Sequence, residues 1–397
     1  MRIALISDAY PPLRTSAAVQ MHDLAREFHA QGHEATVLVP EAAGRDAWSL
    51  EIQEGVRVVR LKSLRTKDIG YFRRTIGELL LSTMMWRNLR ASPLRSAAWD
   101  GLVWYSPTIF FGALVGALKQ ASECRSYLVL RDIFPEWAVD MGLIGRGPIY
   151  HYFKAFERRQ YAVADAIGVQ SPSNLGYLRA WAATSGGRLE VLNNWLADSP
   201  SAPNPMSIAG TALAGRTILV YAGNMGVAQG MDIVFELATE LRCRQDIGFL
   251  FVGRGSEVPR LKALVKARAL DNVMFFEEID PADVKGLLMQ CHVGLVALDP
   301  RHKTHNVPGK FLAYMQAGLP VLARINAGND LAQLIEKEQV GRAYVGDSVE
   351  DLRKLTEELC DHTALRESMS ENARRLSVRA FSVSSAVRQI TAALSAS

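Results

Sequence analysis

Short apolar runs alternate with segments of helical periodicity along nearly all 397 residues. The apolar runs lie at residues 3–7, 35–39, 56–61, 102–105, 127–130, 166–169 and 189–192, and then at 217–221, 247–252, 273–276, 293–298, 321–323 and 343–345. The helical segments lie at 17–31, from 108, at 150–161, after 172, 230 and 256, from 281 and 308, near 331, and from 348 onwards. This alternation is typical of parallel sheets covered by helices, so we predict an α/β fold.

Residues 196–215 interrupt the alternation with a stretch rich in Ser, Pro, Ala, Asn and Gly. Such a composition without durable periodicity is typical of a linker. The chain is too long for one ordinary core, and 49% of its residues are hydrophobic, which suffices for two cores. We predict one domain at 1–195, a linker at 196–215 and a second domain at 216–379.

The segment 305–323 has the features of a phosphate-binding loop. It follows an apolar run, opens with His305, Asn306 and Val307, continues with Pro308, Gly309 and Lys310, and then has helical periodicity. Pro suits the first turn of a helix, where no N–H is needed. The free N–H groups of that turn, the helix dipole and the Lys310 ammonium together suit a diphosphate. An ordinary strand–loop–helix unit with an exposed lysine is the alternative interpretation.

Two further loops follow predicted strands, at the end of a parallel sheet where ligands bind. After residue 221 come Gly223, Asn224, Met225 and Gln229, in which glycine permits close backbone approach and the amides supply neutral donors. After residue 252 come Gly253 and Arg254, and arginine pairs with phosphate in a bidentate manner. A simple tight turn and a solvated arginine would show the same patterns.

In the first half, Arg131 and Asp132 follow an apolar run and precede an aromatic-rich segment. Adjacent charges at the end of a strand favour a functional site. A plain ion pair between these two residues, at the edge of the domain, is the alternative.

Composition excludes several classes of protein. No apolar run approaches the roughly 18–20 residues that cross a bilayer, and the N-terminus has no signal-peptide pattern. The four cysteines lack metal-type spacing, which favours reduced thiols in a cytoplasmic protein. No Ser-His-Asp order, paired-His metal spacing or Walker loop is present. The net charge of +4 and the lack of a reader motif give no support for nucleic-acid binding.

Basic residues concentrate between residues 60 and 95, interleaved with apolar ones. The basic residues and tryptophan that we single out are Arg65, Lys67, Arg73, Arg74, Trp86, Arg87 and Arg90. This mixture suits an element lying in the headgroup region of an anionic membrane. A solvated helix pair with its apolar side on the core is the alternative.

Taken together, five groups of motifs resemble the family 4 retaining glycosyltransferases. They are Tyr10-Pro11-Pro12 with Leu24-Ala25-Arg26-Glu27 and Gly32-His33-Glu34, the run from Arg131 to Glu136, Ser171-Pro172-Ser173-Asn174, and the loops at Gly223 and Pro308. The likeness spans nearly the whole chain. It implies the GT-B fold, two Rossmann-like domains facing a central cleft, in which a C-terminal helix, here 380–397, completes the N-terminal domain.

The chain departs from the family pattern at several positions. His305 and Ala313 stand where the family has two glutamates, and Asn224 and Gln229 stand where it has Arg and Lys. Arg131 replaces a His, and Thr15-Ser16 replaces a glycine pair. An inactive homologue and a specialised branch would both show such changes.

One branch looks similar in the string from Asn306 to Phe311 and in Gly223-Asn224-Met225-Gly226. Its members are O-antigen and capsule enzymes that transfer N-acetyl-L-fucosamine from its UDP-sugar. The family His contacts the 6-hydroxyl of a hexose, and a 6-deoxy sugar has none, which agrees with Arg131 at that position.

The resemblance implies a retaining, metal-independent glycosyltransferase without a cofactor, on the inner face of a bacterial plasma membrane. Its substrates would be a UDP-sugar and an undecaprenyl-pyrophosphate-linked amino sugar. Catalytic roles are implied for Lys310, Arg254, Arg131 and Asp132; donor binding for Gly223, Asn224, Met225, Gln229, Gly253, Glu278 and the residues from His305 to Lys310; and acceptor contacts for Thr15, Ser16, Glu136 and Ser171. A UDP-sugar 2-epimerase of the same fold and a non-catalytic nucleotide-sugar-binding protein are the alternatives.

Overall fold

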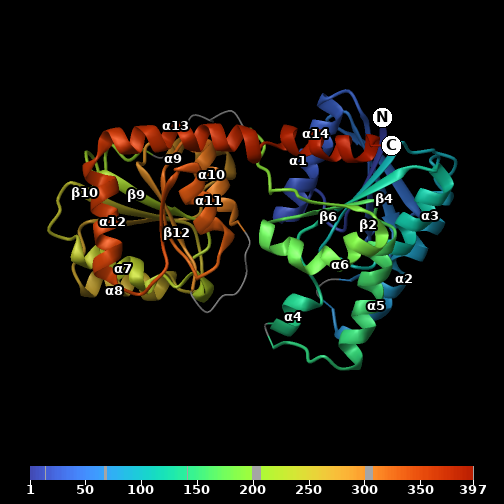
Figure 1. The fold of residues 1–397 in the computed structure, drawn as a ribbon, viewed down its shortest axis with the longest axis horizontal. Helices are drawn as coiled ribbons and strands as arrows, with labels where there is room; N and C mark the ends of the chain where they lie inside the picture. Colours follow the sequence, from blue (N-terminus) through green and yellow to red (C-terminus); the bar gives the residue numbers. More distant parts are fainter. Residues whose placement is uncertain (14, 67–68, 141, 199–206, 300–306, 397) are drawn as a thin grey trace. The chain divides into compact units, whose positions relative to one another are not determined.

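The computed structural model describes residues 1–13, 15–66, 69–140, 142–198, 207–299 and 307–396, and these form two compact units. The first unit comprises Met1–Asn193 and Val383–Ser397, and the second comprises Asn194–Ser382. In Figure 1 the first unit runs from blue to green, with the red C-terminal helix, and the second runs from yellow-green to red. Each unit is a sheet covered by helices, so the predicted α/β fold is confirmed.

The first unit contains an eight-stranded sheet in the order β3-β4-β2-β1-β5-β6-β7-β8. All neighbouring strands are parallel except β3, which pairs antiparallel with β4 at the edge. The strands are β1 (Arg2–Ile6), β2 (Glu34–Glu41), β3 (Trp48–Gln53), β4 (Val56–Lys62), β5 (Gly101–Tyr105), β6 (Arg125–Leu130), β7 (Ala166–Val169) and β8 (Arg188–Val191). The central strand β5 is buried at every residue, as a parallel strand covered on both faces must be.

Helices cover the first sheet. They are α1 (Ser16–Ala30), α2 (Tyr71–Arg90), α3 (Gly112–Ser122), α4 (Glu136–Asp140), α5 (Pro148–Ala162), the 3₁₀ helix η1 (Pro172–Asn174), α6 (Leu175–Ser185) and α14 (Val383–Ser395). Thr15 caps α1, because its hydroxyl accepts a hydrogen bond from the N–H of Ala18 at 3.3 Å. The predicted helix at 17–31 therefore begins one residue earlier.

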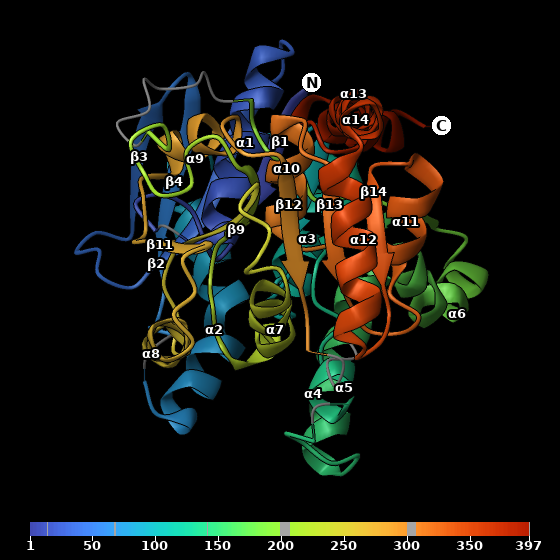
Figure 2. The same cartoon turned by 90° about the vertical axis from the view of Figure 1, so that its left-hand side faces the viewer.

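The second unit contains a six-stranded parallel sheet in the order β11-β10-β9-β12-β13-β14. Its strands are β9 (Thr217–Ala222), β10 (Ile247–Val252), β11 (Val273–Phe276), β12 (Val293–Ala297), β13 (Val321–Arg324) and β14 (Gly341–Tyr344). The first strand, β9, lies in the middle, and the chain proceeds outward first on one side and then on the other (Figure 2). The junction of β9 with β12 is therefore the topological switch point, where ligands of such sheets bind.

The helices of the second unit lie on both faces of this sheet. They are the 3₁₀ helix η2 (Val227–Gln229), α7 (Asp232–Glu240), α8 (Val258–Ala267), α9 (Pro281–Leu288), α10 (Gly309–Ala317), α11 (Asp330–Glu338), α12 (Val349–Asp361) and α13 (Thr363–Ala380). Phe235 of α7 stacks on Phe251 of β10 with ring centroids 4.6 Å apart, in the core on one face of the sheet. Phe311 of α10 belongs to the core on the other face.

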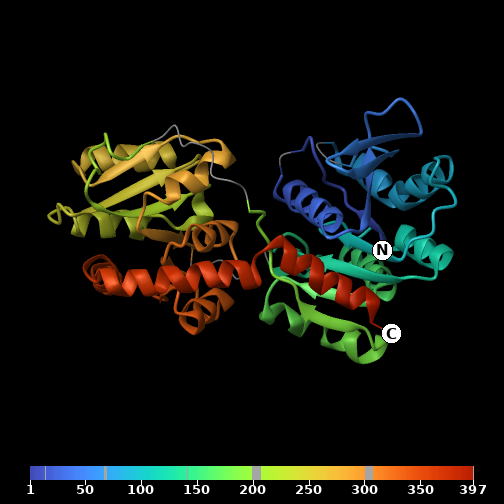
Figure 3. The same ribbon diagram turned by 90° about the horizontal axis from the view of Figure 1, so that it is seen from above.

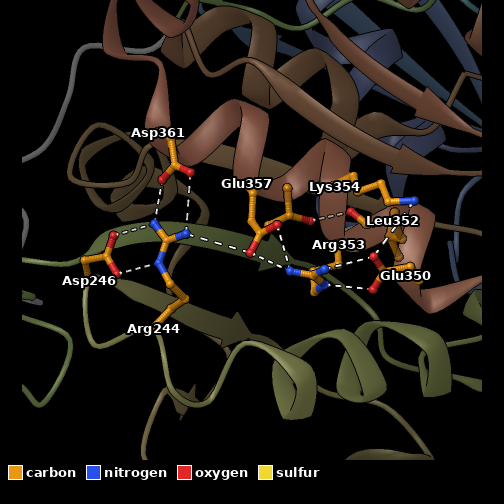
Figure 4. Close-up of polar contacts among 9 residues, drawn as sticks. Arg244, Asp246, Glu350, Leu352, Arg353, Lys354, Glu357 and Asp361 are labelled. Carbon is orange, nitrogen blue, oxygen red and sulfur yellow. Dashed lines mark hydrogen bonds and ion pairs between the residues drawn. The ribbon is translucent and has the colours of Figure 1, made fainter.

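Surface ion pairs connect α12 to the turn after α7. Arg244 pairs with Asp246 at 2.7 Å and also with Asp361, the last residue of α12 (Figure 4). On the same helix, Arg353 pairs with Glu350 and Glu357, each at 2.8 Å. Exposed pairs of this kind contribute little individually, so we assign the packing of α12 mainly to its buried Leu352 and Leu359.

The C-terminal helices divide between the two units. α13 packs against α10 in the second unit, whereas α14 packs against α1 and β6 in the first (Figure 3). Gln389 of α14 donates to the carbonyl of Val191 at 2.9 Å. The chain thus crosses between the units twice, after Asn193 and after Ser382.

The expected linker is in part a packed segment. Residues 199–206 lie outside the described residues, but residues 207–215 fold as turns on the second unit. Ile208 is 5% exposed and Leu213 is fully buried, both in the core of that unit. The polar composition concealed these two apolar side chains, which are enough to hold the segment against the sheet.

Candidate active site

The strands β9 and β12 separate at the switch point, and Tyr314 of α10 fills the space between them. They pair only at Leu219–Val293 and Val220–Gly294. The Tyr314 hydroxyl accepts from the N–H of Ala222 at 3.0 Å and lies 3.1 Å from the carbonyls of both Val220 and Leu295. A Cβ on Gly294 would lie 2.5 Å from the Tyr314 ring. Tyr314 therefore ties α10 to both strands from within the core.

Glycine residues let the loops after β9 and β10 lie directly against each other. Gly223 and Gly253 have φ of +134° and +130°, and a Cβ on Gly253 would lie 2.3 Å from the carbonyl oxygen of Gly223. Gly255 has φ +156°, and its Cβ would lie 2.1 Å from the carbonyl oxygen of Met225. Only glycine fits these positions. The loops form a floor of exposed backbone beside the switch point.

Lys310 lies on this floor. Pro308 is the N-cap of α10 and Gly309 is its first residue, so the helix begins one residue later than predicted and Lys310 lies in its first turn. Its Nζ lies 3.5 Å from the centroid of the Tyr221 ring, and a Cβ on Gly223 would be 3.7 Å from that nitrogen. Burial lowers the pKa of the Lys310 ammonium to about 7. An anion placed here would meet this ammonium and the N–H groups at the start of the helix.

Several predicted donor-binding residues make other contacts. Arg254 is 79% exposed in its side chain and pairs with Glu278 at 3.3 Å. The Gln229 side chain accepts from the N–H of Gly226 at 2.8 Å, and the Asn224 amide lies 3.4 Å from it. These two amides therefore shape the loop around η2, although Asn224 itself remains exposed.

Met225 and Val307 do not present their side chains at the site. Met225 is fully buried among the core residues near Phe251, and Val307 is 7% exposed in the core beside Phe311. Their apolar side chains explain this placement, and only their backbone can face a ligand. Ala313 packs against the same core as Val307. His305 and Asn306 lie outside the described residues.

Arg131 of the first unit is turned inward rather than toward a ligand. It is 6% exposed, and its guanidinium donates to the carbonyls of Leu192 at 2.6 Å and Asn193 at 3.3 Å. Burial lowers the pKa of Arg131. These contacts hold the chain where it leaves the first unit, and the catalytic role of Arg131 stays a prediction. Asp132 next to it is exposed.

The other predicted first-unit residues also lie at the carboxyl edge of the sheet, with the following contacts. Thr15 and Ser16 begin α1 after β1 and are exposed. Ser171 follows β7 and is fully buried, with no hydrogen-bond partner for its hydroxyl among the described residues. Glu136 accepts from the Tyr150 hydroxyl at 2.9 Å and from Lys154 at 2.7 Å. Glu136 therefore joins α4 and α5, and its contact with an acceptor stays a prediction.

Tyr221 and Tyr314 were not predicted as site residues from the sequence. Tyr221 supports the Lys310 amine, and its hydroxyl donates to the carbonyl of Asn224 at 2.8 Å. Tyr314 follows Lys310 by four residues, so the two side chains share a face of α10. That spacing was the available signal. No group of three or more His, Cys, Asp or Glu residues that could hold a metal ion occurs within the described ranges.

Both halves of the chain match glycosyltransferase domain families. Residues 216–362 match the family described as glycosyl transferases group 1, and residues 15–195 match the glycosyl transferase 4-like domain. The chain is 24% identical over 366 residues to the putative colanic acid biosynthesis glycosyl transferase WcaI of Escherichia coli K12, covering 85% of this chain and 86% of that one.

Two further similarities complete the comparison. The chain is 24% identical over 249 residues to the probable glycosyltransferase WbjE of Pseudomonas aeruginosa, a match that spans 62% of each chain and so less than two thirds of that relative. The solved structure of HepE from Anabaena in complex with UDP is 15% identical, has a TM-score of 0.69 and covers 100% of both chains. The latter similarity shows a shared fold.

Proposed function

Because the chain carries the two domains of a GT-B glycosyltransferase, we propose that it transfers a sugar from a UDP carrier to a lipid-linked acceptor in polysaccharide biosynthesis. The observation that carries this proposal is the position of Lys310. Its amine lies at the start of α10, on the Tyr221 ring and beside the Gly223 loop, at the switch point of the second sheet. The diphosphate of a nucleotide-sugar would fit this place, because the glycine loops expose their backbone, the helix presents its N-terminus and Lys310 supplies an amine.

In the proposed reaction, the bond from the anomeric carbon to the diphosphate breaks and a bond from that carbon to the acceptor oxygen forms on the same face. The acceptor proton passes to a phosphate oxygen of the departing UDP, so no protein carboxylate is required as a base. Lys310 and the N–H groups of α10 stabilise the charge that develops on the diphosphate. We propose that no metal ion takes part.

The relatives support UDP and polysaccharide biosynthesis as the context. HepE was solved with UDP and WcaI is named for colanic acid biosynthesis. For the sugar we propose N-acetyl-L-fucosamine, on the strength of the motif around Asn306 and the loop at Gly223. Arg131 supports a 6-deoxy sugar in this proposal, because its guanidinium already donates to two main-chain carbonyls.

The acceptor that we propose is an undecaprenyl-pyrophosphate-linked amino sugar, and the location is the inner face of the plasma membrane. No helix in the described parts of the chain is long and apolar enough to cross a membrane. The feature that supports a membrane-borne acceptor is the basic, partly apolar segment around α2.

The test is transfer by purified protein from UDP-N-acetyl-L-fucosamine to undecaprenyl-pyrophosphate-N-acetylglucosamine, detected by mass spectrometry of the lipid. UDP-glucose and UDP-N-acetylglucosamine are tested in parallel, with and without a chelator. We expect a product from the deoxy sugar alone, unaffected by the chelator, with retained anomeric configuration by NMR.

The Lys310→Met variant should lose transfer, whereas Lys337→Met, the same change at an exposed lysine of α11, should not. No product from any donor, with UDP still raising the melting temperature, would support a non-catalytic nucleotide-sugar-binding protein. Interconversion of UDP-sugars without acceptor would support an epimerase instead.

A further inference from the structure

Large apolar side chains are exposed at two separate places in the first unit. On the N-terminal half of α2 they are Phe72, Ile76, Leu79 and Leu80. Around the α4–α5 connection they are Trp137, Leu143 and Ile149. Phe72 is 78% exposed, Leu143 66% and Ile149 62%. Isolated exposed apolar residues are ordinary, but groups of this size mark surfaces that bind an apolar partner.

Both groups lie at the carboxyl edge of the first sheet. The chain leaves β4 at Lys62 and enters α2 at Tyr71, and it leaves β6 at Leu130 and enters α4 at Glu136. Each connection therefore starts where a parallel strand ends. The first turns of α2 and the α4–α5 connection both project at the lower side of the first unit in Figure 2, at separate places. α2 and α5 both pack against α3 in the first unit.

The second group belongs to a built structure, which we call the tip (residues 136–140 and 142–151). Glu136 of α4 binds Tyr150 and Lys154 of α5, at 2.9 and 2.7 Å. Phe134, just before α4, packs on Phe153 with ring centroids 4.8 Å apart. The N–H groups of Leu143 and Ile144 also donate to the carbonyl of Ala138, at 2.9 and 3.3 Å, so the backbone of the tip is held in place.

Exposed arginines border both groups. Arg65 and Arg73 lie beside the first, and Arg146 lies in the tip. Nearby acids are largely paired, since Glu78 bonds with Arg74 at 2.8 Å and Glu136 with Lys154, although Asp140 is exposed. Apolar side chains with a positive border fit the headgroup region of an anionic bilayer.

We propose that the first unit docks on an anionic lipid bilayer through this carboxyl edge, with the N-terminal half of α2 and the tip both inserted among the headgroups. The contact would give access to a lipid-linked acceptor, and that role rests on the proposed function. Binding to vesicles can be measured independently of that function. Arg87 and Arg90 lie about 21 and 26 Å farther along α2 than Arg73, at about 1.5 Å per residue, and stay outside the contact. The proposed membrane contact therefore includes only part of the basic segment at 60–95, and it also includes the tip.

The experiment is flotation of the full chain with vesicles of phosphatidylglycerol and phosphatidylethanolamine, compared with phosphatidylcholine vesicles. We expect Leu143→Asp with Ile149→Asp to weaken partition into the anionic vesicles by about tenfold or more, because two apolar side chains lose their insertion. Arg73→Glu should weaken it as well. Arg87→Glu with Arg90→Glu, the matched charge change at the other end of α2, should leave flotation unchanged.

Met289→Asp with Val378→Asp provides the control for the apolar changes, since both residues are exposed in the second unit. The proposal would be overturned if the variant Leu143→Asp with Ile149→Asp floated as well as the wild type. It would also be overturned if Arg87→Glu with Arg90→Glu lost as much flotation as Arg73→Glu. Gel filtration showing that the apolar groups join two copies of the chain while vesicles fail to bind would overturn it too. UDP binding, measured in parallel, should be the same in all these variants; its absence in the wild type would refute the proposed function and leave the flotation result standing.

Discussion

At the residue scale, Lys310 has a buried amine, and burial disfavours the charged form of that amine. The ammonium lies over the Tyr221 ring, which attracts a cation, but burial lowers its pKa to about 7. In the free protein near neutral pH the amine is therefore only partly protonated. An anionic ligand would supply the missing countercharge and favour the protonated form.

This position predicts how stability changes with pH. Between about pH 7 and the ordinary lysine pKa near 10.4, the unfolded chain holds a proton at Lys310 that the folded protein has released. Stability should therefore rise with pH in that window, by up to about 1.4 kcal/mol per pH unit. Lys310→Met should remove this slope and should stabilise the free protein at pH 7 and below, where the folded state otherwise bears the buried charge. Chemical unfolding of both proteins from pH 6 to 9.5 measures the difference, and parallel curves would contradict the assignment.

At the element scale, the switch point depends on how α10 is attached to the sheet. β9 and β12 share only two residue pairs, so the strands alone do not fix the distance between the loops that follow them. The Tyr314 hydroxyl connects Ala222 and Val220 of β9 with Leu295 of β12. It therefore sets the position of the Gly223 loop relative to Lys310 on the same helix.

Tyr314→Phe should keep the ring in place but leave buried backbone groups without their partner, at a cost of about 1–3 kcal/mol. Because the loop and Lys310 would no longer be held together, the affinity for UDP should fall at a temperature where the variant remains folded. Tyr344→Phe is the matched control, since its hydroxyl accepts one bond, from Ser348 at 2.7 Å, at the end of β14. Equal UDP affinities for both variants, by calorimetry, would assign Tyr314 to stability alone.

At the scale of the whole molecule, the last helix belongs to the first unit although the preceding 189 residues form the second. α14 buries Val383, Val387, Ile390 and Leu394 in the first unit. Gly101 of β5 has no room for a side chain because a Cβ there would lie 2.8 Å from Leu394. The N-terminal segment therefore lacks part of its core until the C-terminus has been made.

Removal of residues 383–397 should destabilise the first unit severely. Each large apolar side chain buried from water contributes about 1.5–3 kcal/mol, and four of them together approach the whole stability of a domain. Six of the seven tryptophans, all except Trp195, belong to the first unit, so tryptophan fluorescence in urea reports mainly on it. Arg388→Ala, which removes side-chain contacts with Ser384 and Ser385 on the same helix, should leave the transition unchanged. If the truncated protein unfolded at the same urea concentration as the full-length chain, α14 would be dispensable for the stability of the first unit.

The amino-acid sequence by itself determined the elements and the loops that can approach a ligand. Apolar runs such as 217–221 and 293–298 became central strands, and Gly223, Gly253 and Lys310 lie where the local pattern predicted. These features depend on neighbours a few residues away, so periodicity and glycine placement suffice to find them. The antiparallel edge strand Trp48–Gln53, which has no strong apolar run, and the helices α2 and α4 were not among the predicted elements.

The tertiary structure alone decided what each side chain near the site contacts. Arg131 turned toward the carbonyls of Leu192 and Asn193, more than sixty residues away, and Tyr314 reached Val220, 94 residues earlier. The Glu136 carboxylate accepts hydrogen bonds from Tyr150 and Lys154. Such contacts depend on which segments the fold brings together, and a buried polar group bonds with whatever partner is near because leaving it unpaired is costly. The local sequence therefore does not predict which distant residue such a side chain contacts.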